Sequence, residues 1–172
     1  MIDEFIDKLT ESIEDARTGR SFPTEISAAS RDDLIGLSND GWRFDWVQQL
    51  SDGEVYKLKA SKLGRLIHGL ISLSRGEGFV QVNLIESHPE NVGRTKKYVG
   101  VAGNLFAYAA KLAFELGFNG FVAFEAKTEL ISHYEQSLGA RRIRDTQRMY
   151  LDEEAANNLV LKYFGANHGN RS

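Results

Sequence analysis

The stretch that decides the fold is Phe79-Val-Gln-Val-Asn-Leu-Ile-Glu86, followed after a polar loop by Val99-Gly-Val-Ala-Gly-Asn-Leu105. The first run is apolar and predicts a strand, and the second opens a long amphipathic helix. A glycine-rich turn at a helix N-terminus presents unpaired N–H groups and the positive end of the helix dipole. Basic residues precede the turn at Arg94, Lys96 and Lys97. The pattern therefore predicts a site for an anion such as a phosphate.

The elements on either side of this stretch predict the rest of the sheet. The helix over residues 101–116 leads into a second apolar strand, Phe121–Glu125, and a strand-helix-strand unit makes the two strands parallel neighbours. Residues 55–86 read as an antiparallel meander. The expected elements that follow are a helix over 129–138 capped by Thr128, strands at 141–144 and 147–151, and a final helix that is capped by Asp152 and ends at Phe164. This order predicts a mixed α+β fold with a central, mostly antiparallel sheet, one parallel junction after a βαβ crossover, and helices on both faces.

The front of the chain is less regular. Apolar residues recur every three or four positions over residues 2–17, which predicts a helix with a solvated acidic face. Ser30 is an N-cap candidate for a short helix through Leu37. Trp42-Arg-Phe-Asp-Trp46 alternates aromatic and polar side chains, so we expect a half-buried strand in a hairpin with residues 55–59. These aromatics either line an acceptor pocket or, as we favour, belong to the core. Residues 1–172 are expected to form a single domain, with a variable front end at 1–50, a core at 54–151 and a frayed tail at 165–172.

The composition excludes several classes of protein. The chain has 172 residues, a net charge of −3 and no cysteine, so disulfides, thiolate metal sites and a cysteine nucleophile are excluded. The acidic balance gives no support for general nucleic-acid binding. Its four histidines show no ligand spacing, and no metal site is expected. The start of the chain does not resemble a signal peptide, and no apolar run reaches the length of a membrane span. We therefore expect a cytoplasmic protein without nucleic-acid or membrane partners.

Two motifs in this order resemble the GNAT superfamily of acyl-CoA-dependent N-acetyltransferases. The pyrophosphate signature of that family is Gln/Arg-x-x-Gly-x-Gly/Ala, and Lys97-Tyr-Val-Gly100-Val-Ala102 matches it except at the first position, where a lysine keeps the cation. The second motif is a Tyr-Glu-x-x-Leu-Gly-Phe-like run after the fifth strand, here Tyr134-Glu-Gln-Ser-Leu-Gly-Ala140. The resemblance covers residues 54–151 and implies acetyl-CoA as the co-substrate. Alternatively, the small residues at 100, 102 and 103 serve only close packing of the helix on the sheet.

The resemblance also implies which residues contact the co-substrate. These lie at the end of the fourth strand and around the glycine turn. They are Ile85, Ser87, Arg94, Lys97, Tyr98, Val99, Gly100, Val101, Ala102, Gly103 and Asn104. No metal ligand is implied.

Glu86 and Tyr134 are the candidate catalytic residues. Acetyl transfer to an amine requires a base for the amine and an acid for the leaving thiolate. Glu86 is the candidate base, or else a strand-end carboxylate or ion-pair partner. Strict alternation would place it with Val80, Val82 and Leu84, whereas the bulge found in this strand of the family changes the facing, so its side of the sheet is left open. Tyr134 is the candidate acid, or else a tyrosine that covers the sheet edge. His88 and His133 flank these sites as further candidate bases.

The function expected from these observations is transfer of an acetyl group from acetyl-CoA to a primary amine by direct attack in a ternary complex. The alternative is a non-catalytic acyl-CoA-binding, regulatory or interaction domain with the same fold. The acceptor is not identified: a polyamine, an aminoglycoside-like compound, an amino acid, a protein N-terminus and a lysine all remain open. The chain is expected to be a monomer or a homodimer.

Overall fold

The computed structural model describes residues 1–165. The strands are β1 (Ile13–Asp15), β2 (Ser21–Phe22), β3 (Glu25–Ala28), β4 (Glu54–Lys59), β5 (Ile67–Arg75), β6 (Val80–Ser87), β7 (Tyr98–Val99), β8 (Val122–Glu125), β9 (Arg141–Arg142) and β10 (Arg148–Leu151). The α-helices are α1 (Arg31–Leu34), α2 (Trp46–Asp52), α3 (Val101–Glu115), α4 (Ile131–Leu138) and α5 (Glu153–Phe164). Short 3-10 turns are η1 (Leu37–Asp40), η2 (Ser61–Leu63), η3 (Pro89–Asn91) and η4 (Thr128–Leu130). Of the predicted tail at 165–172, all but Gly165 lies outside the described residues.

The main sheet has the predicted topology. Its strand order is β3-β4-β5-β6-β8-β10-β9, and a small second sheet has the order β2-β1-β7. Neighbours in the main sheet are antiparallel except β6 and β8, which are parallel and are joined through α3. A helix crossover is the connection that parallel neighbours require. The α+β prediction with one parallel junction is therefore confirmed.

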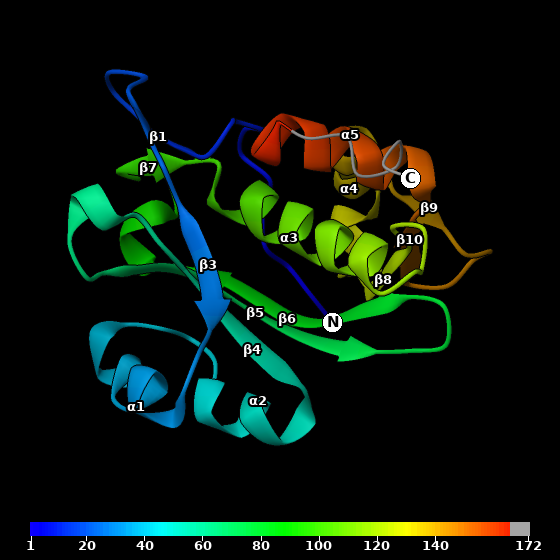
Figure 1. Cartoon of the computed structure of the whole chain (residues 1–172), viewed down its shortest axis with the longest axis horizontal. Coiled ribbons are helices and arrows are strands. Elements are labelled where there is room, and N and C mark those ends of the chain that lie inside the picture. Colours follow the sequence, from blue (N-terminus) through cyan, green and yellow to red (C-terminus); the bar gives the residue numbers. More distant parts are fainter. Residues whose placement is uncertain (166–172) are drawn as a thin grey trace.

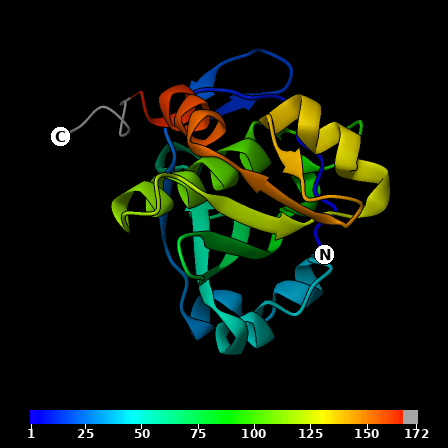
Figure 2. The same ribbon diagram turned by 90° about the vertical axis from the view of Figure 1, so that its right-hand side faces the viewer.

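Helices cover both faces of the sheet, as predicted (Figures 1 and 2). The larger core lies between the sheet and the α3, α4 and α5 side, where Phe106, Phe124 and Tyr134 are fully buried. The smaller core lies on the opposite face, under α1 and α2, around Trp42 and Trp46. These tryptophans are 4% and 2% exposed, so the preferred assignment of the aromatics to the core is confirmed for both of them.

The helix predicted over residues 2–17 is wrong. This segment runs in extended form past the main sheet (dark blue in Figure 1), and Ile2 forms an isolated parallel bridge to Ala126. Burial alternates along it, because Ile2, Glu4 and Ile6 point inward while Phe5 is exposed. Because Glu4 is a polar residue at an inward position, the hydrophobic pattern does not have the period of two that is typical of a strand. The remaining apolar residues recur at the spacing of a helix. Long-range pairing with the sheet overrides the local periodicity.

The strand predicted at Trp42–Trp46 and its hairpin with residues 55–59 are also wrong, since α2 begins at Trp46 and β4 pairs with β3 and β5. The Asp45 side chain accepts a hydrogen bond from Gln48 N at 3.1 Å and caps that helix. The caps at Ser30 and Asp152 are confirmed, but Thr128 caps no helix and instead accepts a hydrogen bond from Gln147.

Candidate functional site

The site lies where β6 and β8 stop pairing. Their register runs from Val80 opposite Val122 to Val82 opposite Phe124 and ends there. Directly beyond, the pairing of β6 with β5 shifts, because Leu73 faces Val82 whereas Ser72 faces Leu84. The skipped residue, Asn83, forms a bulge, which bends a strand and re-aims the side chains after it. The end of β6 thereby leaves the edge of β8.

The bulge settles which way Glu86 faces. Val80 and Val82 belong to the larger core, but beyond the bulge Ile85 takes that side and Leu84 packs with the smaller core. Glu86 is 3% exposed, and its carboxylate accepts hydrogen bonds from Trp46 Nε1 at 2.8 Å and from backbone N–H groups of residues 43 and 44 at 2.7 and 3.4 Å. The carboxylate therefore anchors the start of α2 and its preceding loop to β6.

The first residues of the chain run between the separated strands. Residues 2–10 are called the strap below. Ile2 N–H donates to Glu125 O at 2.7 Å and Ile2 O accepts from Lys127 N–H at 2.9 Å, so the strap continues the edge of β8. On the side of β6, Ser87 N–H donates to the Glu4 carboxylate at 3.0 Å. The strap thus takes up backbone groups that the two diverging strands expose.

The far end of the strap reaches the glycine turn. Gly100 N–H donates to Asp7 Oδ1 at 3.1 Å, and Lys96 Nζ donates to Asp7 Oδ2 at 3.1 Å. Gly100 has φ +92° and lies directly before α3, which has no side-chain cap. A glycine suits this left-handed position, and the first N–H groups of the helix have no intrahelical partner. The turn therefore binds an oxyanion in this structure, and the oxyanion is the chain's own carboxylate.

Tyr134 contacts the middle of the strap. It is fully buried, and its hydroxyl donates to Glu4 O at 2.5 Å. Burial and the neighbouring acids Glu4 and Asp3 raise the pKa of this phenol, which stays protonated at neutral pH. His133 Nε2 accepts from Ile6 N–H at 2.9 Å, and burial lowers the pKa of this imidazole. Tyr134 and His133 thus lie beside the strap.

The Glu4 carboxyl has a strongly raised pKa. Burial raises its pKa from 4.5 to about 7, and the nearby Glu86 adds to the increase. The Ser87 hydrogen bonds and the Arg43 guanidinium act in the opposite direction but do not cancel the cost of burial. Arg43 itself pairs with Asp3 at 2.9 Å. A carboxyl that exchanges its proton near neutrality therefore lies within hydrogen-bonding distance of Ser87.

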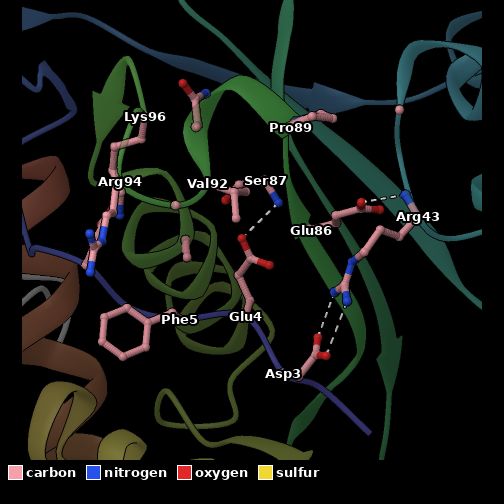
Figure 3. Close-up of a pocket in the computed structure, with 15 residues that line it drawn as sticks. Asp3, Glu4, Phe5, Arg43, Glu86, Ser87, Pro89, Val92, Arg94 and Lys96 are labelled. Carbon is pink, nitrogen blue, oxygen red and sulfur yellow. Dashed lines mark hydrogen bonds and ion pairs between the residues drawn. The ribbon is translucent and has the colours of Figure 1, made fainter.

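A cavity of about 720 Å³ opens beside the strap (Figure 3). Glu4, Phe5 and Asp3 of the strap form one side, and Glu86 and Ser87 at the end of β6 form another. The remaining lining comes from Asp7 of the strap, from the loop after β6, from Gly41 and Arg43 before α2, and from Ala102 of α3. The charges are mixed, with acids from the strap and β6 facing basic residues at 43, 94 and 96. The volume is in the usual range for a small-molecule site.

The predicted site residues are brought together only in part. Four of them line this cavity, namely Glu86, Ser87, Arg94 and Ala102. Other predicted residues do not line it: Ile85 and Val101 are buried in the larger core, Val99 pairs with β1, Tyr98 stacks edge-on with Phe22 and His68, Lys97 pairs with Glu90 at 3.4 Å, and Asn104 donates to Thr24 at 2.9 Å.

Gly100 and Gly103 are tightly packed by other parts of the chain. A Cβ at Gly100 would lie 2.1 Å from Thr10 Oγ1, and one at Gly103 would lie 2.3 Å from the Tyr163 hydroxyl oxygen and 2.9 Å from Leu9 Cδ2. Both positions therefore need a glycine for packing, but the close contacts are with Leu9, Thr10 and Tyr163 and not with the sheet, which the alternative had named. At Gly100 the backbone also binds an anion, so packing and anion binding coexist there.

Sequence reasoning missed the residues of the strap and Arg43. The sequence predicts Glu4 and Asp7 on the solvated face of a helix, because an acid every three or four residues is typical of such a face. A signal was present in Ile2, Glu4 and Ile6, which alternate as inward residues of a strand do. This alternation is not apparent in hydrophobicity alone, because one of the inward positions holds a carboxyl group.

Solved structures of GNAT acetyltransferases have the same fold. The AtaTR complex bound with acetyl-CoA matches with a TM-score of 0.56 at 16% identity, over 79% of this chain and 97% of that chain. The ribosomal-protein-S18-alanine N-acetyltransferase from Escherichia coli matches with 0.54 at 13% identity, over 75% and 93%. Spermidine N-acetyltransferase from Vibrio cholerae matches with 0.53 at 16% identity, over 76% and 94%. The resemblance to the GNAT superfamily is thus confirmed at the level of the fold.

No protein-family profile matches the sequence, and no curated protein sequence matches it. Within residues 1–165, the structure shows no helix long and apolar enough to cross a membrane. The same residues hold no group of histidine and acidic side chains arranged to bind a metal ion.

Proposed function

We propose that the chain is an N-acyltransferase that moves an acetyl group from acetyl-CoA to an amine. The observation that carries this proposal is the oxyanion at the turn before α3, where Gly100 N–H and Lys96 Nζ hold the Asp7 carboxylate. A donor set that binds a carboxylate suits a phosphate oxygen equally well. The solved GNAT structures with this fold include one bound with acetyl-CoA, which supports the assignment of the anion.

The residues around the turn would hold the co-substrate by its phosphates. Gly100 N–H and the first N–H groups of α3 would donate to the pyrophosphate, and Lys96 would pair with its charge. Arg94 lines the same cavity and is a further cation for it. The Ser87 N–H group, at the end of β6, would donate to the thioester carbonyl, where it stabilises the oxyanion of the tetrahedral intermediate.

Transfer requires one base and one acid. The amine nitrogen attacks the thioester carbon and forms the C–N bond of the tetrahedral intermediate, and the C–S bond breaks as this intermediate collapses. The amine loses a proton, and the leaving thiolate gains one. Glu86 is the proposed base, acting directly or through water, because its carboxylate lines the cavity beside Ser87. Tyr134 is the proposed acid, because its phenol stays protonated and donates toward the middle of the strap.

A second candidate function has an observation of its own in favour of it. With the strap in place, the Gly100 and Ser87 N–H groups and the Tyr134 hydroxyl are all engaged by the chain itself. A permanently docked strap would make the chain a non-catalytic regulatory or interaction domain with an acyltransferase fold. A chain that binds acyl-CoA but transfers nothing is the remaining variant of this alternative. The acceptor, the absence of nucleic-acid partners, the cytoplasmic location and the oligomeric state stay predictions.

The experiment is a CoA-release assay with acetyl-CoA against a panel of amines, paired with calorimetric titration of acetyl-CoA. The panel contains polyamines, aminoglycosides, amino acids, and peptides with free N-termini or lysines. The proposal expects amine-dependent release of CoA that falls in Tyr134→Phe and Glu86→Gln while acetyl-CoA still binds. Binding without release for every amine favours the non-catalytic alternative, and absence of binding overturns the acyl-CoA assignment.

A further inference from the structure

The strap occupies the groups that the proposed function assigns to acyl-CoA. Asp7 takes the anion position at Gly100, and the Glu4 carboxylate takes Ser87 N–H. The backbone carbonyl oxygen of Glu4 accepts the hydrogen bond that the Tyr134 hydroxyl donates. An acidic peptide segment therefore presents a negative charge at one end of the site and carbonyl-type oxygens at the other.

Space at the turn is also taken by the strap. The Thr10 side chain lies so close to Gly100 that an added Cβ would sit 2.1 Å from its hydroxyl oxygen. Thr10 is 1% exposed, and its N–H donates to the Tyr163 hydroxyl at 3.1 Å. A phosphate oxygen cannot accept from Gly100 N–H while Asp7 Oδ1 holds that group. The strap and a bound pyrophosphate are mutually exclusive.

From this overlap, and resting on the proposed function, we propose that the strap is a built-in competitor of acyl-CoA. Acyl-CoA binds after residues 2–10 leave the space between β6 and β8, and the docked strap holds the chain in a closed state. The occupant is an acidic extended segment of the same chain.

The strap is built to be displaced as a unit. Residues 11 and 12 connect its C-terminal end to β1, and Glu14 of β1 pairs with Val99 immediately before the turn. Glu11, between the strap and β1, is exposed, so a hinge there can release the strap while β1 stays paired. Docking buries Ile2 and Ile6, but it also buries the Glu4 carboxyl and leaves Phe5 59% exposed. Burial of the two isoleucines favours docking of the strap, whereas burial of the carboxyl opposes it. The free energy of docking is therefore small enough for acyl-CoA to compete.

A reversible covalent lock tests the proposal. Ile2 and Ala126 are partners in a parallel bridge, and adjacent strands lie about 4.8 Å apart, which is within the range that a disulfide spans. The chain has no cysteine, so the variant I2C/A126C can form one disulfide only. The oxidised disulfide ties the N-terminal end of the strap to position 126, while the other end stays attached to the chain. Reduction frees the N-terminal end. The matched control is E25C/K59C, which joins partners in β3 and β4, away from the site.

Calorimetric titration of acetyl-CoA is then run on the oxidised and reduced forms. We expect the oxidised lock to bind at least about tenfold more weakly than its reduced form, because the open population is removed. The control pair is expected to show no difference. Equal affinities for the oxidised and reduced lock overturn the competitor proposal and leave the proposed function standing. Absence of binding in every form overturns both.

A charge variant provides a second test in case the lock fails to fold. Asp7→Asn weakens the hydrogen bonds to Gly100 and Lys96, and we expect it to bind acetyl-CoA about tenfold more tightly, or about 1.4 kcal/mol. Glu11→Gln is the control, because it removes the same charge from an exposed neighbour whose side chain makes no hydrogen bond within residues 1–165. An equal gain in both variants, or none in Asp7→Asn, contradicts the proposal.

Discussion

The Glu4 carboxyl makes a quantitative prediction about stability and pH. Burial raises its pKa from 4.5 to about 7 in the folded chain. The folded state therefore favours the protonated form, and this contribution is fully present below pH 4.5 and is lost as the pH rises to about 7. Since one pKa unit corresponds to about 1.36 kcal/mol, the loss amounts to roughly 3 kcal/mol.

Glu4→Gln removes this titration but keeps a side-chain oxygen that accepts from Ser87 N–H. Relative to the native chain, we expect the variant to gain roughly 3 kcal/mol of unfolding free energy between pH 4.5 and 8, with most of the change complete near pH 7. The other charged groups that face Glu4 are Glu86 and Arg43, and both remain in the variant. Their effects therefore largely cancel in the comparison.

The assay is urea unfolding at a series of pH values, followed by the fluorescence of the buried tryptophans. Glu11→Gln is the matched control, since its carboxyl is exposed and its difference from the native chain should not change over this range. A Glu4→Gln difference that stays constant within about 0.5 kcal/mol from pH 4.5 to 8 would refute the reasoning. It would mean that Glu4 is not buried in the folded protein.

Three further substitutions test the packing of the site. Glu86→Gln is expected to lower the unfolding free energy by about 2–3 kcal/mol, because the amide turns a donor toward buried N–H groups; an unchanged urea midpoint would contradict the anchoring role. Tyr134→Phe should cost about 1 kcal/mol through the lost hydrogen bond to Glu4 O, and in kinetics it should lower kcat with little change in KM for acetyl-CoA. Gly103→Ala should lower stability by about 1–3 kcal/mol although alanine favours helices, because its Cβ meets the Tyr163 hydroxyl; a rise in the thermal midpoint would show that the helix can shift.

The part of the fold that the sequence predicts well is its local part. β6, α3 and β8 follow one another within residues 80–125, and each has the hydrophobic period of its element. The crossover rule then fixes β6 and β8 as parallel neighbours. The glycine turn follows from the same run, since a glycine directly before a helix suits a left-handed backbone, and Gly100 has that conformation.

The strap could not be predicted in this way, because its conformation depends on partners more than 80 residues away. Ile2 pairs with Ala126, and Glu4 contacts Ser87 and Tyr134. The local periodicity of apolar residues instead indicates a helix, because the buried Glu4 interrupts the apolar–polar alternation that is typical of a strand. Such long-range pairing overrides the weak helix preference of an isolated segment.

The facing of Glu86 depended on one residue. A regular strand would place Glu86 with Val80 and Val82, and the bulge at Asn83 reverses this. Nothing in the letters around Asn83 distinguishes a bulge from regular pairing, since the shift is set by the register with β5. The helix at Trp46 differs, because an aspartate directly before it is a typical capping residue, whereas the alternating aromatics indicate a strand.

The central claim is that the space between β6 and β8, ending at Gly100, binds acetyl-CoA. The most direct test is a calorimetric titration of acetyl-CoA into the native chain and into Asp7→Asn, with amide hydrogen exchange measured on residues 2–10 and 99–104. The account predicts one site per chain, tighter binding by the variant, protection at 99–104 and increased exchange along the strap. Absence of binding in both proteins, or binding without any change in these two segments, would contradict it.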